Sequence, residues 1–448
     1  MQTIDAGMTW TPSGWQAHAG SAPGRWVVPG IPNLHSHAFQ RAMAGLAEHQ
    51  THPNHGGLGA RDTHDSFWTW RETMYRFAAR FDPDTLYAVA AQLYAEMLEA
   101  GYTTVCEFHY LHHAPDGNPY ADRAAMSHAL IAAARDTGIR LTLLPVLYMS
   151  GGFDGRALGE RQRRFGHDVD GFLALLDLLR KQEDDTVRIG CALHSLRAVP
   201  EAAMQEVVAA LPTGARIHIH IAEQIGEVQD CIALRGARPV EWLLANADVD
   251  ARWTLVHATH LTDAEVAGIA RSGATVAICP TTEANLGDGL FPLRAYLDAN
   301  GLDAGGAWGV GSDSQISVSP IEELRWLEYG QRLATHHRNI AVGADSPSVG
   351  ETLLRSALAS GANATGHAIG GLDPDSCADW ITLDSDAPQL AGMTTMDVVD
   401  RWIFSGNRNL VRDVHVDGVQ VVANGEHRNR AAIAARFRGA MQSLLADS

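Results

Sequence analysis

Short apolar runs alternate with amphipathic stretches along most of this 448-residue chain. The stretches at 83–100, 168–182 and 239–245 place apolar residues at helical spacing, whereas the runs between helices are apolar on both faces. Such runs are typical of parallel strands covered by helices. Their repetition predicts an α/β fold, a (β/α)8 barrel. The predicted strands lie within residues 27–37, 103–109, 140–148, 187–194, 216–223, 253–260, 274–280 and 307–313.

The two ends of the chain show a different pattern. Residues 379–383 and 414–422 alternate apolar and polar positions, as antiparallel strands do. Asp417-Gly418 and Asn424-Gly425 are typical of the tight turns between such strands. With residues 8–28, these segments predict a small β-sandwich domain built from both termini and closed by a helix over 430–445. We place this domain at 1–28 and 376–448, and the barrel at 29–375.

Composition restricts the classes of function. Hydrophobic residues make up 46% of the chain and charged residues 19%, which is typical of a globular protein. The 52 acidic against 34 basic residues give a net charge of −18, which argues against a general binder of nucleic acid or of anionic membranes. We find no signal peptide, no apolar stretch near the ~20 residues of a membrane span, and no C-x-x-C pair. We therefore expect a cytoplasmic protein without nucleic-acid or membrane partners.

Titratable side chains stand at the ends of several predicted strands. His35 and His37 end the first run, and alternate strand residues point to the same side. His220 with Glu223, then His257, and finally Asp313 end later runs. Because the carboxyl ends of barrel strands meet at one face, we expect these groups to lie together. His218 is two residues from His220, and strand parity does not decide which of them faces inward.

Three imidazoles and one carboxylate are typical ligands of a catalytic zinc ion. Such an ion lowers the pKa of a bound water from about 15.7 towards about 7, and Glu223 beside it is suited to carry a proton. Structural zinc sites more often use closely spaced cysteines. Iron or manganese also fits a site of this kind.

The motifs around these residues resemble the amidohydrolase superfamily. His35-x-His37, His220-x-x-Glu223 and the late Gly311-Ser312-Asp313 are similar to its deaminase branch, which uses one metal. The single lysine, Lys181, agrees, because the two-metal branches commonly use a carboxylated lysine. Longer blocks, PNLHSHAFQRAMAG at 32–45, EFHY at 107–110 and HSLRAV at 194–199, resemble the formimidoylglutamate deiminases from about residue 29 onward. These enzymes of histidine degradation hydrolyse N-formimino-L-glutamate to N-formyl-L-glutamate and ammonia.

The resemblance implies a role for each matching residue. Glu223 moves a proton to the leaving nitrogen, His257 orients the metal-bound water with Asp313, and Gln40 contacts the formimino group. Arginine suits the two substrate carboxylates because its planar donors bind bidentately. The resemblance further implies a small dicarboxylate as substrate and a homodimer. One zinc per chain is assigned to His35, His37, His220 and Asp313, and the carboxylates to Arg61, Tyr110, His194 and Arg197, with Tyr102 as the alternative to Tyr110.

Two other functions fit part of this pattern. A deaminase of a nucleobase or other cyclic amidine uses the same metal chemistry, but it needs aromatic stacking and amide hydrogen bonds to a ring. A non-catalytic metal-binding protein leaves Glu223 and His257 without a purpose. The long connection over residues 45–71, rich in glycine and histidine, is expected at the same face of the barrel, where such loops often act as lids or set specificity.

Overall fold

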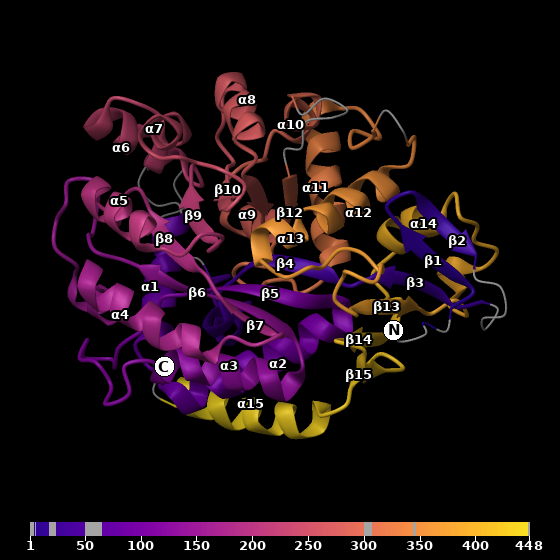
Figure 1. Ribbon diagram of the computed structural model, residues 1–448, viewed down its shortest axis with the longest axis horizontal. Coiled ribbons are helices and arrows are strands. Elements are labelled where there is room, and N and C mark those ends of the chain that lie inside the picture. The colour runs from indigo at the N-terminus through magenta and orange to yellow at the C-terminus, as the bar shows by residue number, and fades with distance from the viewer. Residues whose placement is uncertain are drawn as a thin grey trace.

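The computed structural model describes residues 4, 6–17, 24–49, 65–299, 307–343 and 346–446. It contains a parallel barrel sheet surrounded by helices and a second sheet at one side (Figure 1). The fold class expected from the sequence is confirmed. Among the described residues, no helix is both long enough and apolar enough to cross a membrane.

The barrel strands follow one another in chain order, each parallel to its neighbours, and β7 (Val187–Ile189) extends the pairing of β6. Backbone hydrogen bonds between His35, His37 and Asp313 join the last strand to the first. The strands are β4 (Ile31–Ser36), β5 (Tyr102–His109), β6 (Arg140–Leu147), β8 (Cys191–Ser195), β9 (Ile217–Ile221), β10 (Trp253–His257), β11 (Thr275–Ile278) and β12 (Ala307–Val310).

Two of the predicted runs each form two strands, and both breaks involve a glycine. The run over 27–37 divides at Gly30 between the two sheets, and the run over 187–194 divides at Gly190. A Cβ on Gly30 would lie 2.0 Å from Thr103 Oγ1, and one on Gly190 would lie 2.5 Å from Leu144 Cδ2. Only glycine allows the backbone this close to its neighbours.

Helices cover the outside of the barrel. The prediction for 83–100 is confirmed with the same bounds: Asp82 accepts a hydrogen bond from Thr85 N at the start, and Gly101 ends the helix with a φ of +103°. The helices are α1 (Phe67–Ala78), α2 (Pro83–Ala100), α3 (Ala125–Thr137), α4 (Val169–Leu179), α5 (Glu201–Ala210), α6 (Ile225–Arg235), α7 (Pro239–Asn246), α8 (Asp263–Ser272), α9 (Pro280–Leu286), α10 (Leu293–Ala299), α11 (Pro320–Thr335), α12 (Val349–Ala359), α13 (Gly361–Thr365), α14 (Val398–Phe404) and α15 (Arg430–Leu445), with 3-10 turns η1 (Ala38–Met43), η2 (Glu160–Phe165), η3 (Arg180–Gln182) and η4 (Pro388–Leu390).

Both chain ends contribute strands to the second sheet, where the first and last colours of the chain lie side by side (Figure 1). Its strands form one hydrogen-bonded sheet. Asp417, Gly418, Asn424 and Gly425 all have positive φ, as the tight turns predicted there require. The strand order is β16 (Glu426–His427), β15 (Val419–Ala423), β14 (Val411–Val416), β13 (Trp380–Leu383), β3 (Trp26–Pro29), β1 (Met8–Thr11) and β2 (Gly14–Ala17).

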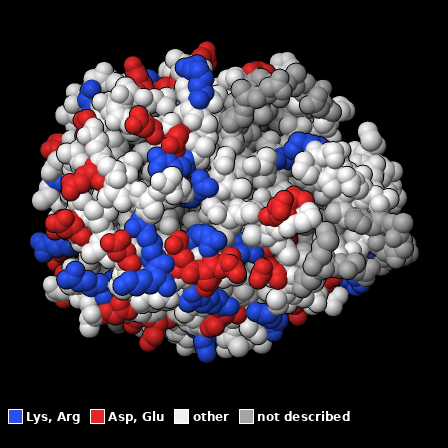
Figure 2. Space-filling model, in the orientation of Figure 1, with Lys and Arg blue, Asp and Glu red and all other residues white. Residues whose placement is uncertain are grey.

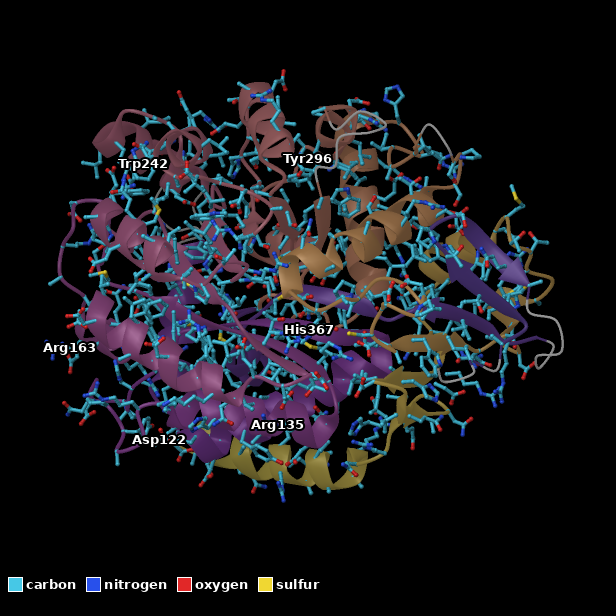
Figure 3. The ribbon with its side chains drawn as sticks, viewed as in Figure 1. Asp122, Arg135, Arg163, Trp242, Tyr296 and His367 are labelled. Carbon is cyan, nitrogen blue, oxygen red and sulfur yellow. The ribbon has the colours of Figure 1, made fainter. Side chains whose placement is uncertain are left out.

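Buried polar contacts connect the two sheets. The Arg140 guanidinium at the start of β6 donates from Nε to Asp379 Oδ2 at 2.8 Å and from Nη2 to Oδ1 at 2.9 Å. Gly30 N donates to Asp379 O, so this aspartate also holds the point where the chain passes between the sheets. His367, labelled in Figure 3, donates from Nε2 to Leu141 O in β6. Figure 2 shows acidic and basic side chains interspersed over one face, not a continuous basic surface.

Candidate active site

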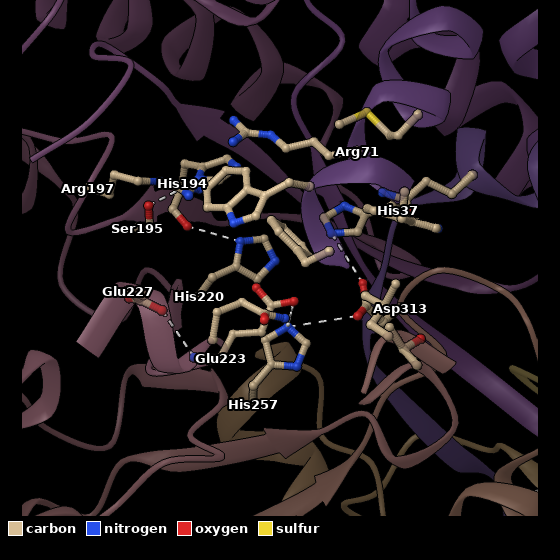
Figure 4. A pocket seen from close by; sticks show the side chains of 18 of the residues that line it. His37, Arg71, His194, Ser195, Arg197, His220, Glu223, Glu227, His257 and Asp313 are labelled. Atoms are coloured by element: carbon tan, nitrogen blue, oxygen red, sulfur yellow. Dashed lines mark hydrogen bonds and ion pairs between the residues drawn. The ribbon is translucent and has the colours of Figure 1, made fainter. Parts of the chain in front are cut away.

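A pocket opens at the carboxyl ends of the barrel strands (Figure 4). Its floor carries the histidines and carboxylates singled out in the sequence, and α1 supplies an aromatic wall. The described residues that line it are His37, Gln40, Phe67, Trp68, Trp70, Arg71, Met74, Tyr110, His194, Ser195, Arg197, His220, Glu223, Gln224, Glu227, Asp230, His257, Thr282, Leu286 and Asp313.

The geometry of four side chains fits a divalent metal. His35 Nε2 lies 3.2 Å from His37 Nε2 and 3.0 Å from His220 Nε2. Asp313 Oδ1 lies 3.5 Å from His35 Nε2 and 3.4 Å from His37 Nε2. Ligands about 2.1 Å from a tetrahedral zinc stand about 3.4 Å apart, so these donor separations fit the ion. His257 also lies close enough to His35 and His220 to complete a second set of three.

Tertiary structure resolves which histidine of β9 faces the site. His220 Nε2 points to His35, whereas His218 Nε2 donates to Ala364 O at 2.9 Å and is not part of the converging set. The small residues before Asp313 leave room for a close approach of two strands, because a Cβ on Gly311 would lie 2.7 Å from His35 Cβ. The last strand can therefore approach the first and bring Asp313 to the histidines.

Backbone carbonyls orient two of the imidazoles. His37 donates from Nδ1 to Phe108 O at 2.8 Å, and His220 donates from Nδ1 to His194 O at 3.0 Å. Each Nε2 is then unprotonated, and its lone pair points to the space between the four side chains. This is the tautomer that a metal requires.

Burial keeps the three imidazoles neutral, as metal binding requires. It lowers the pKa of His35 to about 3 and also lowers the pKa values of His37 and His220. Burial alone would raise the pKa of Asp313, but the hydrogen bond with His35 and the positive charge of His257 hold that pKa below its usual value.

Two further titratable groups stand beside this donor set. His257 Nε2 lies 3.9 Å from Glu223 Oε1 and 3.8 Å from Asp313 Oδ2. Burial lowers the pKa of His257, but the carboxylates of Glu223, Glu283 and Asp313 outweigh it and raise this pKa to about 10. Burial raises the pKa of Glu223 above its usual value, which makes this carboxyl a better proton acceptor.

The polar groups expected to hold the substrate lie around the same pocket, as far as they are described. Gln40 donates from Nε2 to Tyr110 OH at 3.0 Å, and its Oε1 is buried without a hydrogen-bond partner among the described residues. Tyr102, the alternative to Tyr110, is fully buried and is not part of the lining. His194 and Arg197 line the pocket. Arg61 and most of the predicted loop over 45–71 lie outside the described residues.

Three lining or supporting residues escaped the sequence analysis. Arg71 on α1 donates to Tyr148 OH at 3.0 Å and lies over the rings of Trp68 and Tyr75. Glu227 accepts a hydrogen bond from Glu223 N at 3.1 Å, and burial raises its pKa to about 7. Glu283 on α9 accepts from His257 Nδ1 at 3.3 Å. In sequence, each resembles an ordinary polar residue of an amphipathic helix. The Trp68-Thr69-Trp70-Arg71 block was the available signal for Arg71.

Comparisons with known proteins agree with this geometry. The sequence profile of the amidohydrolase family matches residues 26–421. Formimidoylglutamate deiminase from Pseudomonas aeruginosa is 50% identical over 420 residues, which cover 94% of this chain and 89% of that protein. The crystal structure of an amidohydrolase from Brucella melitensis superposes with a TM-score of 0.89 at 42% identity, covering 99% of this chain and 100% of that one. A zinc-bound adenosine deaminase from Xanthomonas campestris shares the fold, with a TM-score of 0.78 at 21% identity and coverage of 98% and 97%.

Proposed function

The chain belongs to the amidohydrolase family, and we propose that it hydrolyses the formimino C=N group of N-formimino-L-glutamate to N-formyl-L-glutamate and ammonia. One observation carries the choice of substrate. The converging histidines and Asp313 share a pocket with two arginines, Arg71 and Arg197, that make no ion pair among the described residues. The site thus combines a hydrolytic centre with cations for two carboxylates. The likeness to the Pseudomonas deiminase supports the same substrate.

We propose one zinc ion per chain, held by His35, His37, His220 and Asp313. When bound, zinc supplies a Lewis acid that lowers the pKa of water to about 7, so that a hydroxide nucleophile is available at neutral pH. The reaction adds the water oxygen to the formimino carbon, and the C–N bond to the terminal nitrogen then breaks.

Glu223 transfers protons in this step, and His257 orients the attacking water. Glu223 takes one proton from the attacking water and delivers it to the terminal nitrogen as the C–O bond forms. It then carries the remaining hydroxyl proton to the same nitrogen, which departs as ammonia while the C=O bond of the product forms. Burial raises the pKa of this carboxyl, which favours its uptake of a proton. His257, between Glu223 and Asp313, orients the nucleophile.

Other residues of the pocket position the substrate. Gln40 Oε1 accepts a hydrogen bond from the formimino N–H in this proposal. Its amide nitrogen donates to Tyr110, and Oε1 has no other partner among the described residues. Arg71 and Arg197 lie on the same aromatic wall, with their guanidinium carbons 5.3 Å and 5.7 Å from the ring centroid of Trp68. This arrangement favours a substrate with an acidic tail over an uncharged ring.

The proposal is tested by ammonia release from N-formimino-L-glutamate, with zinc-loaded wild type beside Glu223→Gln. We expect turnover by the wild type and a loss of at least ~10³-fold in kcat in the variant, with zinc still bound. Arg197→Gln and Arg71→Gln are expected to raise KM by about 10–100-fold, because each removes a charge-assisted contact. Arg180→Gln, which breaks only the exposed pair with Asp177, is the matched control.

Two outcomes of this experiment would contradict the proposed substrate. Folded, zinc-loaded wild type that releases no ammonia from this substrate would refute the assignment. Turnover of adenosine or cytosine by the same preparation would favour the cyclic-amidine deaminase, for which Trp68 and Trp70 would provide the stacking surface.

A further inference from the structure

Glu283 is a buried carboxylate directly behind His257. It lies on α9, its side chain is 4% exposed, and it does not line the active-site pocket. His257 donates from Nδ1 to Glu283 Oε1 at 3.3 Å, and Cys279 N donates to the same oxygen at 2.9 Å. The position of this carboxylate is therefore set by the backbone at the start of α9 as well as by the imidazole.

The ring of His257 packs against His35 and His220 but makes few polar contacts. His257 ends β10 with a φ of +72°, a conformation that residues other than glycine rarely adopt. Its Nε2 faces Glu223 and Asp313 across 3.9 Å and 3.8 Å, beyond hydrogen-bond distance. Among the described residues, the contact with Glu283 is the one hydrogen bond made by the ring.

We propose that Glu283 is a positioning residue for the hydrolytic reaction and acts through His257. By accepting the Nδ1 proton, it holds the imidazole in one orientation and leaves Nε2 directed at Asp313, Glu223 and the reacting atoms. Partners that orient a functional imidazole from behind commonly have this effect. The inference rests on the proposed hydrolysis for its kinetic test, but the hydrogen bond itself can be examined without any substrate.

A neighbouring carboxylate supplies the matched control. Glu323 on α11 is also fully buried and accepts hydrogen bonds from Thr281 N at 2.9 Å and Thr281 Oγ1 at 2.6 Å. Glu283 and Glu323 thus both support the first turn of α9, but only Glu283 contacts His257. A role limited to the stability of α9 would make Glu283→Gln and Glu323→Gln behave alike.

The kinetic test is a double-mutant cycle on the zinc-loaded enzyme with N-formimino-L-glutamate. We expect Glu283→Gln to lower kcat by about 10–100-fold with little change in KM, and Glu323→Gln to stay within about threefold of wild type. In a His257→Asn background, Glu283→Gln should cost no more than about a further threefold, because its partner is already gone. Equal losses in the two backgrounds would overturn the proposal.

The substrate-free test is proton NMR of the zinc-loaded protein. An imidazole N–H donated to a carboxylate gives a strongly downfield resonance, which His257→Asn identifies by its disappearance. We expect Glu283→Gln to remove or shift this signal and Glu323→Gln to retain it. An unchanged signal in Glu283→Gln would overturn the proposal even if the substrate assignment holds.

Metal analysis tests whether Glu283 positions His257 or instead binds a metal ion. His257, Cys279 and Glu283 also stand close enough together to hold a cation. We expect one zinc per chain in wild type and in Glu283→Gln. A second bound equivalent that is lost from the variant would assign Glu283 to a metal site and overturn the positioning role.

Discussion

Two groups of histidines lie near the carboxyl ends of the barrel strands and are almost equally crowded. We call the first group, His35, His37 and His220, the metal cluster. Its ring centroids are 4.6 Å apart for His35 and His37 and 4.8 Å apart for His35 and His220. The second, the β5 cluster, has centroids 4.6 Å apart for His112 and His167 and 4.7 Å apart for His113 and His167. Its members are His109, His112, His113 and His167.

The two groups differ in where their nitrogens point and in their charged neighbours. The metal cluster brings its Nε2 atoms together beside Asp313. In the β5 cluster, His112 and His113 donate from Nε2 to Val146 O and Gly166 O, and no set of three ligand atoms within the cluster converges. The buried cation Arg164 lowers the pKa values of His109 and His113, in addition to the effect of burial. Convergent lone pairs and a carboxylate, not the crowding of imidazoles, therefore distinguish the proposed metal site from the β5 cluster.

The largest expected effect separates the two groups directly. His37→Asn should remove a ligand, lowering bound zinc and reducing kcat/KM by more than ~10³-fold, because the reaction depends on the metal. His112→Asn should retain one zinc per chain and activity within about tenfold of wild type. Metal analysis and ammonia release measure both. Loss of zinc from His112→Asn in a folded protein would contradict the comparison.

A smaller effect is expected on stability when the metal is withdrawn. A ligand present at 1,000 times its Kd stabilises the folded state by about 4 kcal/mol, so chelation should lower the free energy of unfolding by roughly that amount. His112→Asn should show the same loss, whereas His37→Asn should respond little to chelator. Denaturant unfolding with and without chelator gives both values, and equal responses in the two variants would argue against the assigned ligands.

The smallest effect concerns acid pH and the β5 cluster. Burial lowers the pKa of His167 from 6.5 to about 4. Between pH 6.5 and 4, His167 is protonated in the unfolded state but neutral in the folded state. Its contribution to the free energy of unfolding is therefore fully present above pH 6.5 and is lost as the pH falls towards 4. One histidine contributes about 1.4 kcal/mol per pH unit in that window.

Comparison of variants isolates this contribution. In chelated protein, His167→Gln should show a shallower loss of unfolding free energy on acidification than wild type. His337→Gln, at an exposed position, is the control for the loss of one histidine. Identical slopes for all three proteins would show that His167 does not remain neutral in the fold.

Local sequence pattern determined much of this molecule. The eight apolar runs predicted the barrel strands. A strand that is buried on both faces is apolar along its whole length, and this pattern can be recognised without knowledge of distant residues. Asp417-Gly418 and Asn424-Gly425 predicted the turns of the terminal sheet, because only a few residues tolerate positive φ at both central positions. The strand-end motifs also indicated which elements carry polar groups to the pocket.

Only the tertiary structure decided which of those groups meet and in what orientation. It selected His220 over His218, brought Arg71 from α1 to the pocket and placed Glu283 behind His257. Asp313 and His257 adopt φ values of +44° and +72°, which the alternation of a strand does not predict. The physical reason is that a metal or substrate site depends on directions between atoms far apart in sequence. Those directions follow from barrel closure and strand-end backbone, whereas sequence periodicity reports only local burial.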